Sequence, residues 1–390
     1  MSIEGLLSPK VRNMPPSGIR KFFDYTAGMT DVISLGVGEP DFVTPRHVRD
    51  ACIAALEKGR TSYTSNAGLP ELREAIAEYV HGSFGVGYEP SSETIVTVGS
   101  SEAIDLALRA LITEGDEVLV PSPCYISYSP ITSLGGGKPV PVETSDRDHF
   151  KLTAEALKAR LTPRSKVLML CYPNNPTGGI MTYEDWLPIA KLAEEHNLAV
   201  IADEIYAELT YGSRHVSFAA LPGMKERTLL VGGLSKAFAM TGWRIGYACG
   251  PEELITAVLK IHQYTVMCAP ILGQIAALES FRNGMEEKDR MIESYDRRRR
   301  AFVSGLRQIG LPCHEPMGSF YAFPSIAHTG LSSEQFTQML LHESKVVTVP
   351  GHIFGPGGEG FIRCSYASSQ GQLDEALERM DAFLRRRLSL

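Results

Sequence analysis

One lysine of this chain lies in an unusually apolar stretch, residues 234–244, which reads LSKAFAMTGWR. Lys236 is followed by Ala237, Phe238 and two further apolar residues, and the next charged side chain is Arg244. Burying an unpaired ammonium group is costly, and a buried lysine usually responds by losing its proton. The stretch therefore predicts either ordinary core with one unfavourable residue or a lysine that works as a neutral amine.

A second set of residues could hold a phosphate group. Gly99, Ser100 and Ser101 follow the β-rich run 94–98 and stand where a helix is expected to begin. Free backbone N–H groups, the helix dipole and two hydroxyls favour an anion at such a position. Serine at a helix start is also common as a simple cap, so this signal alone is weak. Arg244 precedes the run 245–250 and offers a guanidinium fork that matches phosphate geometry.

Two more β-rich runs are followed by polar groups. Asn175 lies in PNNPTGG after the run 166–172, where prolines and glycines force an irregular turn. Asp203 ends the run 198–203, and a buried carboxylate there needs a cationic partner. A protonated ring nitrogen would serve, and so would an arginine elsewhere in the protein. Tyr206, three residues on, is within reach of the same place.

The elements that must position these residues alternate along the middle of the chain. Seven β-rich runs (94–98, 117–121, 138–143, 166–172, 198–203, 228–233 and 245–250) are separated by helical patterns at 101–112, 124–134, 153–161, 182–196 and, more weakly, 216–220. Several runs are apolar at consecutive positions, as strands covered on both faces require. The alternation predicts an α/β fold with a mainly parallel sheet.

Ligands of such sheets bind beyond the carboxyl ends of the strands. The turn 99–101, Asn175, Asp203 and Lys236 each lie at or after the end of a β-rich run, so we expect them at this edge of the sheet. One ligand would explain them together, namely a phosphorylated pyridine aldehyde. Its aldehyde would form a Schiff base with Lys236, and its ring nitrogen would pair with Asp203.

The last third of the chain predicts a second, α+β domain. Long helical patterns at 252–283 and 286–308 precede short β-rich runs near 346–349 and 361–366 and a final helix at 370–388. The N-terminal segment is rich in proline and glycine and is typical of an arm. The predicted division is residues 1–45 as an N-terminal arm and part of a small domain, 46–283 as a large cofactor-binding domain and 284–390 as a small C-terminal domain.

The bulk composition disfavours several other classes of protein. The 390 residues carry a net charge of -7, which gives no basic surface for nucleic acid. No apolar run is long enough to span a membrane, and the ten histidines show no metal-ligand spacing. The seven cysteines occur singly, as in a reduced cytoplasmic protein, and the N-terminus lacks the apolar core of a signal peptide. We therefore expect a cytoplasmic protein without a metal, a nucleic-acid partner or a membrane partner.

The chain resembles the class I/II aminotransferases, which are pyridoxal-phosphate enzymes of fold type I. The motifs VISLGVGEPDF, SYTSNAGLPELREAI, NNPTGG, ADEIY, SKAFAMTGWRIGY and GSFYAFP follow one another in the family's order. The resemblance runs from SGIRKFF to FIRCSYA, nearly the whole chain, and rests on the agreement of several motifs. It implies pyridoxal 5′-phosphate as cofactor, with a large domain built on a mainly parallel seven-stranded sheet and a smaller α+β domain.

The resemblance also implies roles around the cofactor. Lys236 would form the Schiff base and, once displaced, would move a proton between the substrate's Cα and the cofactor's C4′. Asp203 would keep the ring nitrogen protonated. Tyr206 and Asn175 would hydrogen-bond the ring hydroxyl oxygen, and Tyr125 would stack on the ring. The phosphate would be held by Gly99, Ser100, Ser101, Ser235 and Arg244.

Other implied residues bind the substrate or join two subunits. Arg363, in FIRCSYA, matches the arginine that clamps the α-carboxylate of the substrate, with Gly38 and Asn175 beside it. Ile19 lies in the lid-like SGIRKFF, and Arg20 could bind a side-chain carboxylate if it turns inward. Tyr63, in TSYTSNAG, resembles the tyrosine that reaches the phosphate of the neighbouring subunit, which implies a homodimer.

The activity implied by the resemblance is a ping-pong transamination. An L-amino acid of the aspartate or aromatic type would give its amino group to the cofactor, and a 2-oxo acid such as 2-oxoglutarate would take it up. Ser101 stands where some aspartate-using relatives carry a lysine, so the preferred amino acid is left open.

Three rival functions need weighing against transamination. The main alternative is a pyridoxal-phosphate C–S lyase or another β-eliminating enzyme of the same fold. A transcription regulator would need an N-terminal helix-turn-helix module, for which the roughly 30 residues before VISLGVGEP are too few. An NAD-dependent enzyme would need a glycine fingerprint that the chain lacks.

Overall fold

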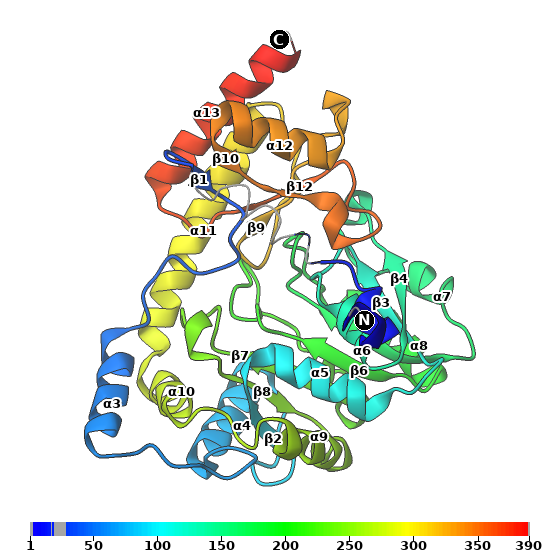
Figure 1. Ribbon diagram of the computed structural model, residues 1–390, viewed down its shortest axis with the longest axis vertical. Coiled ribbons are helices and arrows are strands. Elements are labelled where there is room, and N and C mark those ends of the chain that lie inside the picture. The colour runs from blue at the N-terminus through cyan, green and yellow to red at the C-terminus, as the bar shows by residue number, and fades with distance from the viewer. Residues whose placement is uncertain (1–2, 17, 19–28, 389–390) are drawn as a thin grey trace.

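A computed structural model describes residues 3–16, 18 and 29–388. The seven β-rich runs form one sheet with the strand order β2-β8-β7-β6-β5-β3-β4 (Figure 1). Strand β8 is antiparallel to its neighbours β2 and β7, and the other pairings in the sheet are parallel, which confirms the predicted α/β fold. The strands are β2 (Thr94–Thr97), β3 (Glu117–Ser122), β4 (Lys138–Glu143), β5 (Ser165–Cys171), β6 (Ala199–Asp203), β7 (Thr228–Gly233) and β8 (Gly246–Cys249).

Helices cover both faces of this sheet because its strands are apolar on both sides. Met169 of β5 belongs to the core that includes α5 and α9, whereas Leu168 and Leu170 belong to the core that contains Trp186 of α8. Successive side chains of a strand point to opposite faces, so both layers are buried at once. The helices of this part are α3 (Arg46–Glu57), α4 (Pro70–Phe84), α5 (Gly99–Leu111), α6 (Tyr128–Leu134), α7 (Ala154–Lys158), α8 (Tyr183–Glu195), α9 (Glu252–Thr265) and α10 (Ile271–Asn283).

Some helix predictions are wrong in extent. The pattern 252–283 forms two helices, α9 and α10, because Met267 adopts a positive φ of 70° and Pro270 has no amide hydrogen to continue a helix. The weak pattern 216–220 forms only a short 3₁₀ turn, Phe218–Ala220. Helices α3, α4 and α12 (Ser333–Ser344) were not among the predicted elements. The capping box at the start of α12 is a signal that could have located it.

The C-terminal part contains two long helices and two small sheets. Helix α11 (Met285–Gln308) contacts α13 (Gln370–Leu388), which also contacts α12 (Figure 1). The antiparallel sheet has the order β11 (Val349–Pro350), β12 (Ile362–Ser365) and β9 (Tyr321–Ala322).

The N-terminal segment joins this C-terminal part through the second small sheet. Strand β1 (Ile33–Ser34) pairs in parallel with β10 (Val346–Val347), and Ser365 N–H donates to the carbonyl oxygen of Leu35 at 2.7 Å. This pairing agrees with assigning residues up to 45 in part to the small domain, although the three-part division stays a prediction. Within the described residues, no helix combines the length and the apolar character needed to cross a membrane.

Candidate active site

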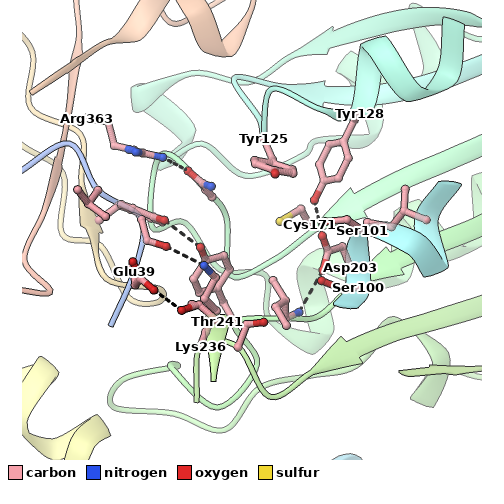
Figure 2. Close-up of a pocket in the computed structure, with 18 of the residues that line it drawn as sticks. Glu39, Ser100, Ser101, Tyr125, Tyr128, Cys171, Asp203, Lys236, Thr241 and Arg363 are labelled. Atoms are coloured by element: carbon pink, nitrogen blue, oxygen red, sulfur yellow. Dashed lines mark hydrogen bonds between the residues drawn. The ribbon is translucent and has the colours of Figure 1, made fainter. Parts of the chain in front are cut away.

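A pocket of about 400 Å³ lies at the carboxyl ends of the central strands of the large sheet. Figure 2 shows Arg363 on one side of it, Asp203 and Tyr128 on the other, and Lys236 between them. The predicted site residues that line the pocket are Gly38, Ser100, Ser101, Tyr125, Asn175, Asp203, Tyr206, Ser235, Lys236, Arg244 and Arg363. Residues that are far apart in the sequence, from the large sheet and from the small antiparallel sheet, therefore meet at one place.

Asp203 is the last residue of β6 and is held between two neighbouring strands of the sheet. Its Oδ2 accepts a hydrogen bond from Tyr128 Oη at 2.7 Å, and its Oδ1 accepts from the Ile205 N–H at 3.2 Å (Figure 2). Burial raises the pKa of this carboxyl to about 6, and the two hydrogen bonds only partly oppose that rise. A buried carboxylate of this kind would be stabilised by a cation brought into the pocket.

Lys236 follows β7 on an irregular turn, and its Nζ donates to the carbonyl oxygen of Gly38 at 2.7 Å. Burial is the main cause that lowers the pKa of Lys236 to about 8, and the positive charge of Arg363 adds to it. The apolar residues around the lysine in the sequence are buried, among them Leu234, Ala237 and Phe238. Of the two interpretations of this stretch, the lysine that is readily neutral is the one that fits these surroundings.

Arg363 lies on β12 with only 2% of its surface exposed. Its Nη1 donates to Asn175 Oδ1 at 2.9 Å, and its Nη2 donates to the carbonyl oxygen of Gly36 at 2.7 Å. The guanidinium lies 4.4 Å from the ring centre of Tyr321 and 5.0 Å from that of Phe354. Its Nε is buried and has no hydrogen-bond partner within the described part of the chain. The Arg363 guanidinium is thus a buried cation held in place by its neighbours, and its Nε–H is still free to donate within the described part of the chain.

The start of α5 forms a cradle in which glycine is required. Gly99 has a φ of 74°, and a Cβ on it would lie 2.6 Å from Arg244 Nη2. A Cβ on Gly246 of β8 would lie 2.4 Å from the backbone nitrogen of Ser100. The two glycines therefore let the arginine and the neighbouring strand approach the backbone N–H groups of the helix start, a position that favours anions.

Several pocket residues were missed by sequence reasoning. Tyr128 and Tyr321 line the pocket, as do Glu39 and Thr241, whose side chains hydrogen-bond each other (Figure 2). Arg244 Nη1 also donates to the carbonyl oxygen of Thr241 at 2.9 Å. Tyr321 belongs to the GSFYAFP motif, and Tyr128 follows Tyr125 by three residues, so both were close to signals already recognised.

Two predicted residues do not line the pocket, and two others fall outside the described structure. Gly99 does not line the pocket itself, but it lies against Arg244, which does. Tyr63 is 81% exposed on the surface of the single chain. Ile19 and Arg20 lie outside the described residues.

The polar groups of the pocket match the groups of pyridoxal phosphate. No basic side chain of the described residues hydrogen-bonds the buried Asp203 carboxylate, which suits a protonated ring nitrogen. The cradle at Gly99 with Arg244 suits a phosphate. Lys236 provides the amine for an aldehyde. Within the described residues, no three or more metal-ligating side chains gather in one place.

Comparisons with known proteins agree with this geometry. The family model of aminotransferase class I and II matches residues 30–380. A protein of Bacillus subtilis (strain 168) named "Putative aminotransferase YugH" is 56% identical, over 97% of this chain and 98% of its own. The aspartate aminotransferase of Pyrococcus abyssi is 44% identical, with coverage of 97% and 98%.

Among solved structures, the aromatic aminotransferase from Pyrococcus horikoshii OT3 superimposes with a TM-score of 0.91. It is 42% identical and covers 95% of this chain and 100% of its own. Fold, motifs and relatives agree over nearly the whole length. The chain therefore belongs to the class I and II aminotransferases, and it is an enzyme that depends on pyridoxal phosphate.

Proposed function

We propose that this enzyme transfers the amino group of an L-amino acid of the aspartate or aromatic type to a 2-oxo acid such as 2-oxoglutarate, in two ping-pong half-reactions. The observation that carries the proposal is the convergence of Lys236, Asp203 and Arg363 in one pocket. These side chains provide an amine with a lowered pKa, a buried carboxylate and a buried guanidinium. Names of relatives support both substrate types, since one is an aspartate and one an aromatic aminotransferase.

On the cofactor side, each residue has a distinct task. Bound pyridoxal phosphate supplies an aldehyde carbon that joins to nitrogen and a ring that accepts the electrons of a broken Cα–H bond. Asp203 holds the ring nitrogen in its protonated form, and Tyr128 holds the Asp203 carboxylate in place. Tyr206 and Asn175 would donate to the ring oxygen, and Tyr125 would pack against the ring. The phosphate would be held by Gly99, Ser100, Ser101, Ser235 and Arg244, of which all but Gly99 line the pocket.

On the substrate side, Arg363 binds the α-carboxylate and so fixes the direction of the Cα–H bond. The freed amine of Lys236 then removes the proton from Cα, and its lowered pKa keeps a useful fraction neutral near pH 8. Gly38 lies beside Lys236, because its carbonyl oxygen accepts the hydrogen bond from the lysine, and it lines the same pocket as Arg363. Ile19 is also proposed to bind the substrate, and it is left open whether Arg20 or another residue binds a side-chain carboxylate.

We also propose that the working unit is a homodimer in the cytoplasm. Tyr63 would reach the phosphate bound by the other subunit, and its 81% exposure in the single chain leaves it available for such a contact. The N-terminal segment and the small domain would close over the substrate carboxylate and exclude water.

Visible absorption of the purified protein tests the proposal. The wild type should show the visible band of the lysine-bound cofactor, and Lys236→Ala should lose it. Transamination should fall by at least about 10⁴-fold, because the same substitution removes the nucleophile and the general base. Lys225→Ala, which removes a lysine paired with Glu93 outside the pocket, is the matched control and should keep both.

Single amino acids are then added to the wild type. Those that bleach the band and yield the aminated cofactor and a 2-oxo acid name the donors. Bleaching by no amino acid would sink the transaminase assignment. Release of ammonia or a thiol without formation of the aminated cofactor would instead favour the β-eliminating alternative.

A further inference from the structure

Tyr321 is a fully buried tyrosine of β9 that faces the pocket. Its hydroxyl lies 2.9 Å from the hydroxyl of Tyr206, in hydrogen-bond distance. The face of its ring lies 4.4 Å from the guanidinium carbon of Arg363. One side chain thus contacts both the residue proposed to touch the ring oxygen of the cofactor and the residue proposed to bind the substrate carboxylate.

The same hydroxyl also limits what can stand at position 38. A Cβ on Gly38 would lie 2.4 Å from Tyr321 Oη, closer than two such atoms can approach. The carbonyl oxygen of Gly38 accepts the hydrogen bond from Lys236 Nζ at 2.7 Å. Tyr321 therefore packs against the peptide that holds the lysine amine as well.

The direction of the hydrogen bond between the two tyrosines follows from counting hydrogens. A tyrosine hydroxyl has one hydrogen to donate. If Tyr206 gives its hydrogen to the ring oxygen, then the hydrogen between the two tyrosines must come from Tyr321. Hydrogen bonds in such a chain strengthen one another, because each polarises the next.

Arg363 makes Tyr321 a better donor. A cation over the face of a phenol ring is attracted by the ring and draws electron density from it. The charge of Arg363 acts to lower the pKa of the Tyr321 hydroxyl, although burial, the larger cause, raises it above the usual value. The O–H bond of Tyr321 is therefore polarised toward Tyr206 while the group stays protonated.

We propose that Tyr321 is a positioning residue with two separable parts. Its hydroxyl supports Tyr206 as donor to the ring oxygen of the cofactor, and its ring supports Arg363 as the binding group for the substrate carboxylate. This inference rests on the proposed function, since it uses the roles assigned there to Tyr206 and Arg363.

Two substitutions separate the parts. Tyr321→Phe keeps the ring and removes the hydroxyl, so the visible band of the lysine-bound cofactor should titrate at a pH about 0.5–1 unit higher than in the wild type. Hydrogen-bond donors to the ring oxygen favour the form in which the Lys236 nitrogen has lost its proton. Without the Tyr321 hydroxyl the donor Tyr206 is weaker, so the proton is lost only at higher pH. The KM for the amino acid should stay within about twofold. Tyr321→Leu removes the ring too and should raise that KM about 3- to 30-fold.

Tyr211→Phe is the matched control. Tyr211 is a buried tyrosine whose hydroxyl donates to the carbonyl oxygen of Ser319, an atom that also accepts from Tyr366, and it does not line the pocket. Its loss should leave the titration of the band unchanged. Thermal unfolding of each variant separates loss of folding from a local effect.

The outcomes are distinguishable from failure of the proposed function. A wild type without the visible band would remove the proposed function and this inference together. A normal wild type with a Tyr321→Phe variant that titrates at the same pH would overturn only the role of the hydroxyl. An equal rise in KM in both Tyr321 variants, or an equal shift in Tyr211→Phe, would overturn the separation of the two parts.

Discussion

The large sheet and the small antiparallel sheet contribute to the same pocket in different ways. Asp203 ends a strand within the seven-stranded sheet, and Ser100 lies in the first turn of a helix that packs on that sheet. Arg363 and Tyr321 lie on strands of only four and two residues, and Gly36 lies on a segment without regular structure. The first side is built on strands of one seven-stranded sheet, whereas the second is built on short strands and an irregular segment that lie far apart in the sequence.

The two sides also differ in how their charges are satisfied. Among the described residues, the hydrogen bonds to Asp203 come from the neutral groups of Tyr128 and Ile205, and burial raises the pKa of its carboxyl. Within this part of the chain its negative charge is therefore incompletely balanced. Arg363 already donates to Asn175 and to the carbonyl oxygen of Gly36. We therefore expect substitutions of Asp203 to alter the chemistry of the cofactor and substitutions of Arg363 to alter the binding of the substrate, whereas Tyr321 contacts residues of both sides.

Among substitutions that tell the two sides of the pocket apart, the largest effect is expected for Asp203→Asn. The substitution keeps the size of the side chain and removes the charge that would hold the ring nitrogen protonated. Loss of one such electrostatic group should lower kcat about 10²- to 10³-fold, as measured with saturating amino acid. The thermal stability of the cofactor-free protein should change little, since removal of an unfavourably buried carboxylate offsets the loss of one acceptor.

The control for this substitution is Glu204→Gln. Glu204 is also a buried carboxylate, but it accepts hydrogen bonds from Ser217 and Phe218 and interacts with His215, and it does not line the pocket. Its neutralisation should leave kcat within a few-fold of the wild type, even if stability falls. An equal loss of kcat in both variants would mean that burial of a carboxylate, rather than the place of Asp203, decides the effect.

A smaller and different effect is expected for Arg363→Lys. Lysine keeps the positive charge but cannot donate to the substrate carboxylate and to Asn175 through one planar fork. The kcat/KM for both amino acid and 2-oxo acid should fall about 10- to 100-fold, mainly through KM. The visible band and the affinity for pyridoxal phosphate should be unchanged, because the cofactor side is intact.

The matched control is Arg379→Lys, which changes an arginine that pairs with Asp31 away from the pocket. It should leave the kcat/KM for the amino acid and for the 2-oxo acid as in the wild type. Loss of cofactor affinity in Arg363→Lys would break the comparison, since it would show that the small-sheet side also holds the cofactor.

The same difference between the two sides decides what the sequence could predict. The seven strands were predictable because each is a short apolar run, and Asp203 and Lys236 were recognised because a polar group follows such a run. The contact of Tyr128 with Asp203 was not predictable, since it joins residues 75 positions apart through side chains. Tyr321 was missed for the same reason, because its partners Tyr206, Gly38 and Arg363 come from separate segments that meet only in the fold.

The smallest expected effect is a shift in pH dependence, and it concerns the residue that lies between the two sides. Only a neutral amine attacks an aldehyde, and the neutral fraction rises with pH until the pKa of the amine is passed. The pKa of Lys236 is lowered to about 8, chiefly by burial and also by the charge of Arg363. At pH 7 this leaves roughly 300-fold more neutral amine than an ordinary lysine would have.

The rate at which cofactor-free protein captures pyridoxal phosphate should therefore rise between pH 7 and 8 and level off above about pH 8. The phosphate has lost its second proton throughout this range, so its own titration does not distort the profile. Nα-acetyl-lysine, measured alongside, should still be accelerating at pH 10. In Arg363→Met the plateau should move to higher pH, because a positive charge that disfavours the ammonium form is gone. A profile identical to that of the wild type would mean that the charge of Arg363, and with it the small-sheet side, does not contribute to the reactivity of Lys236.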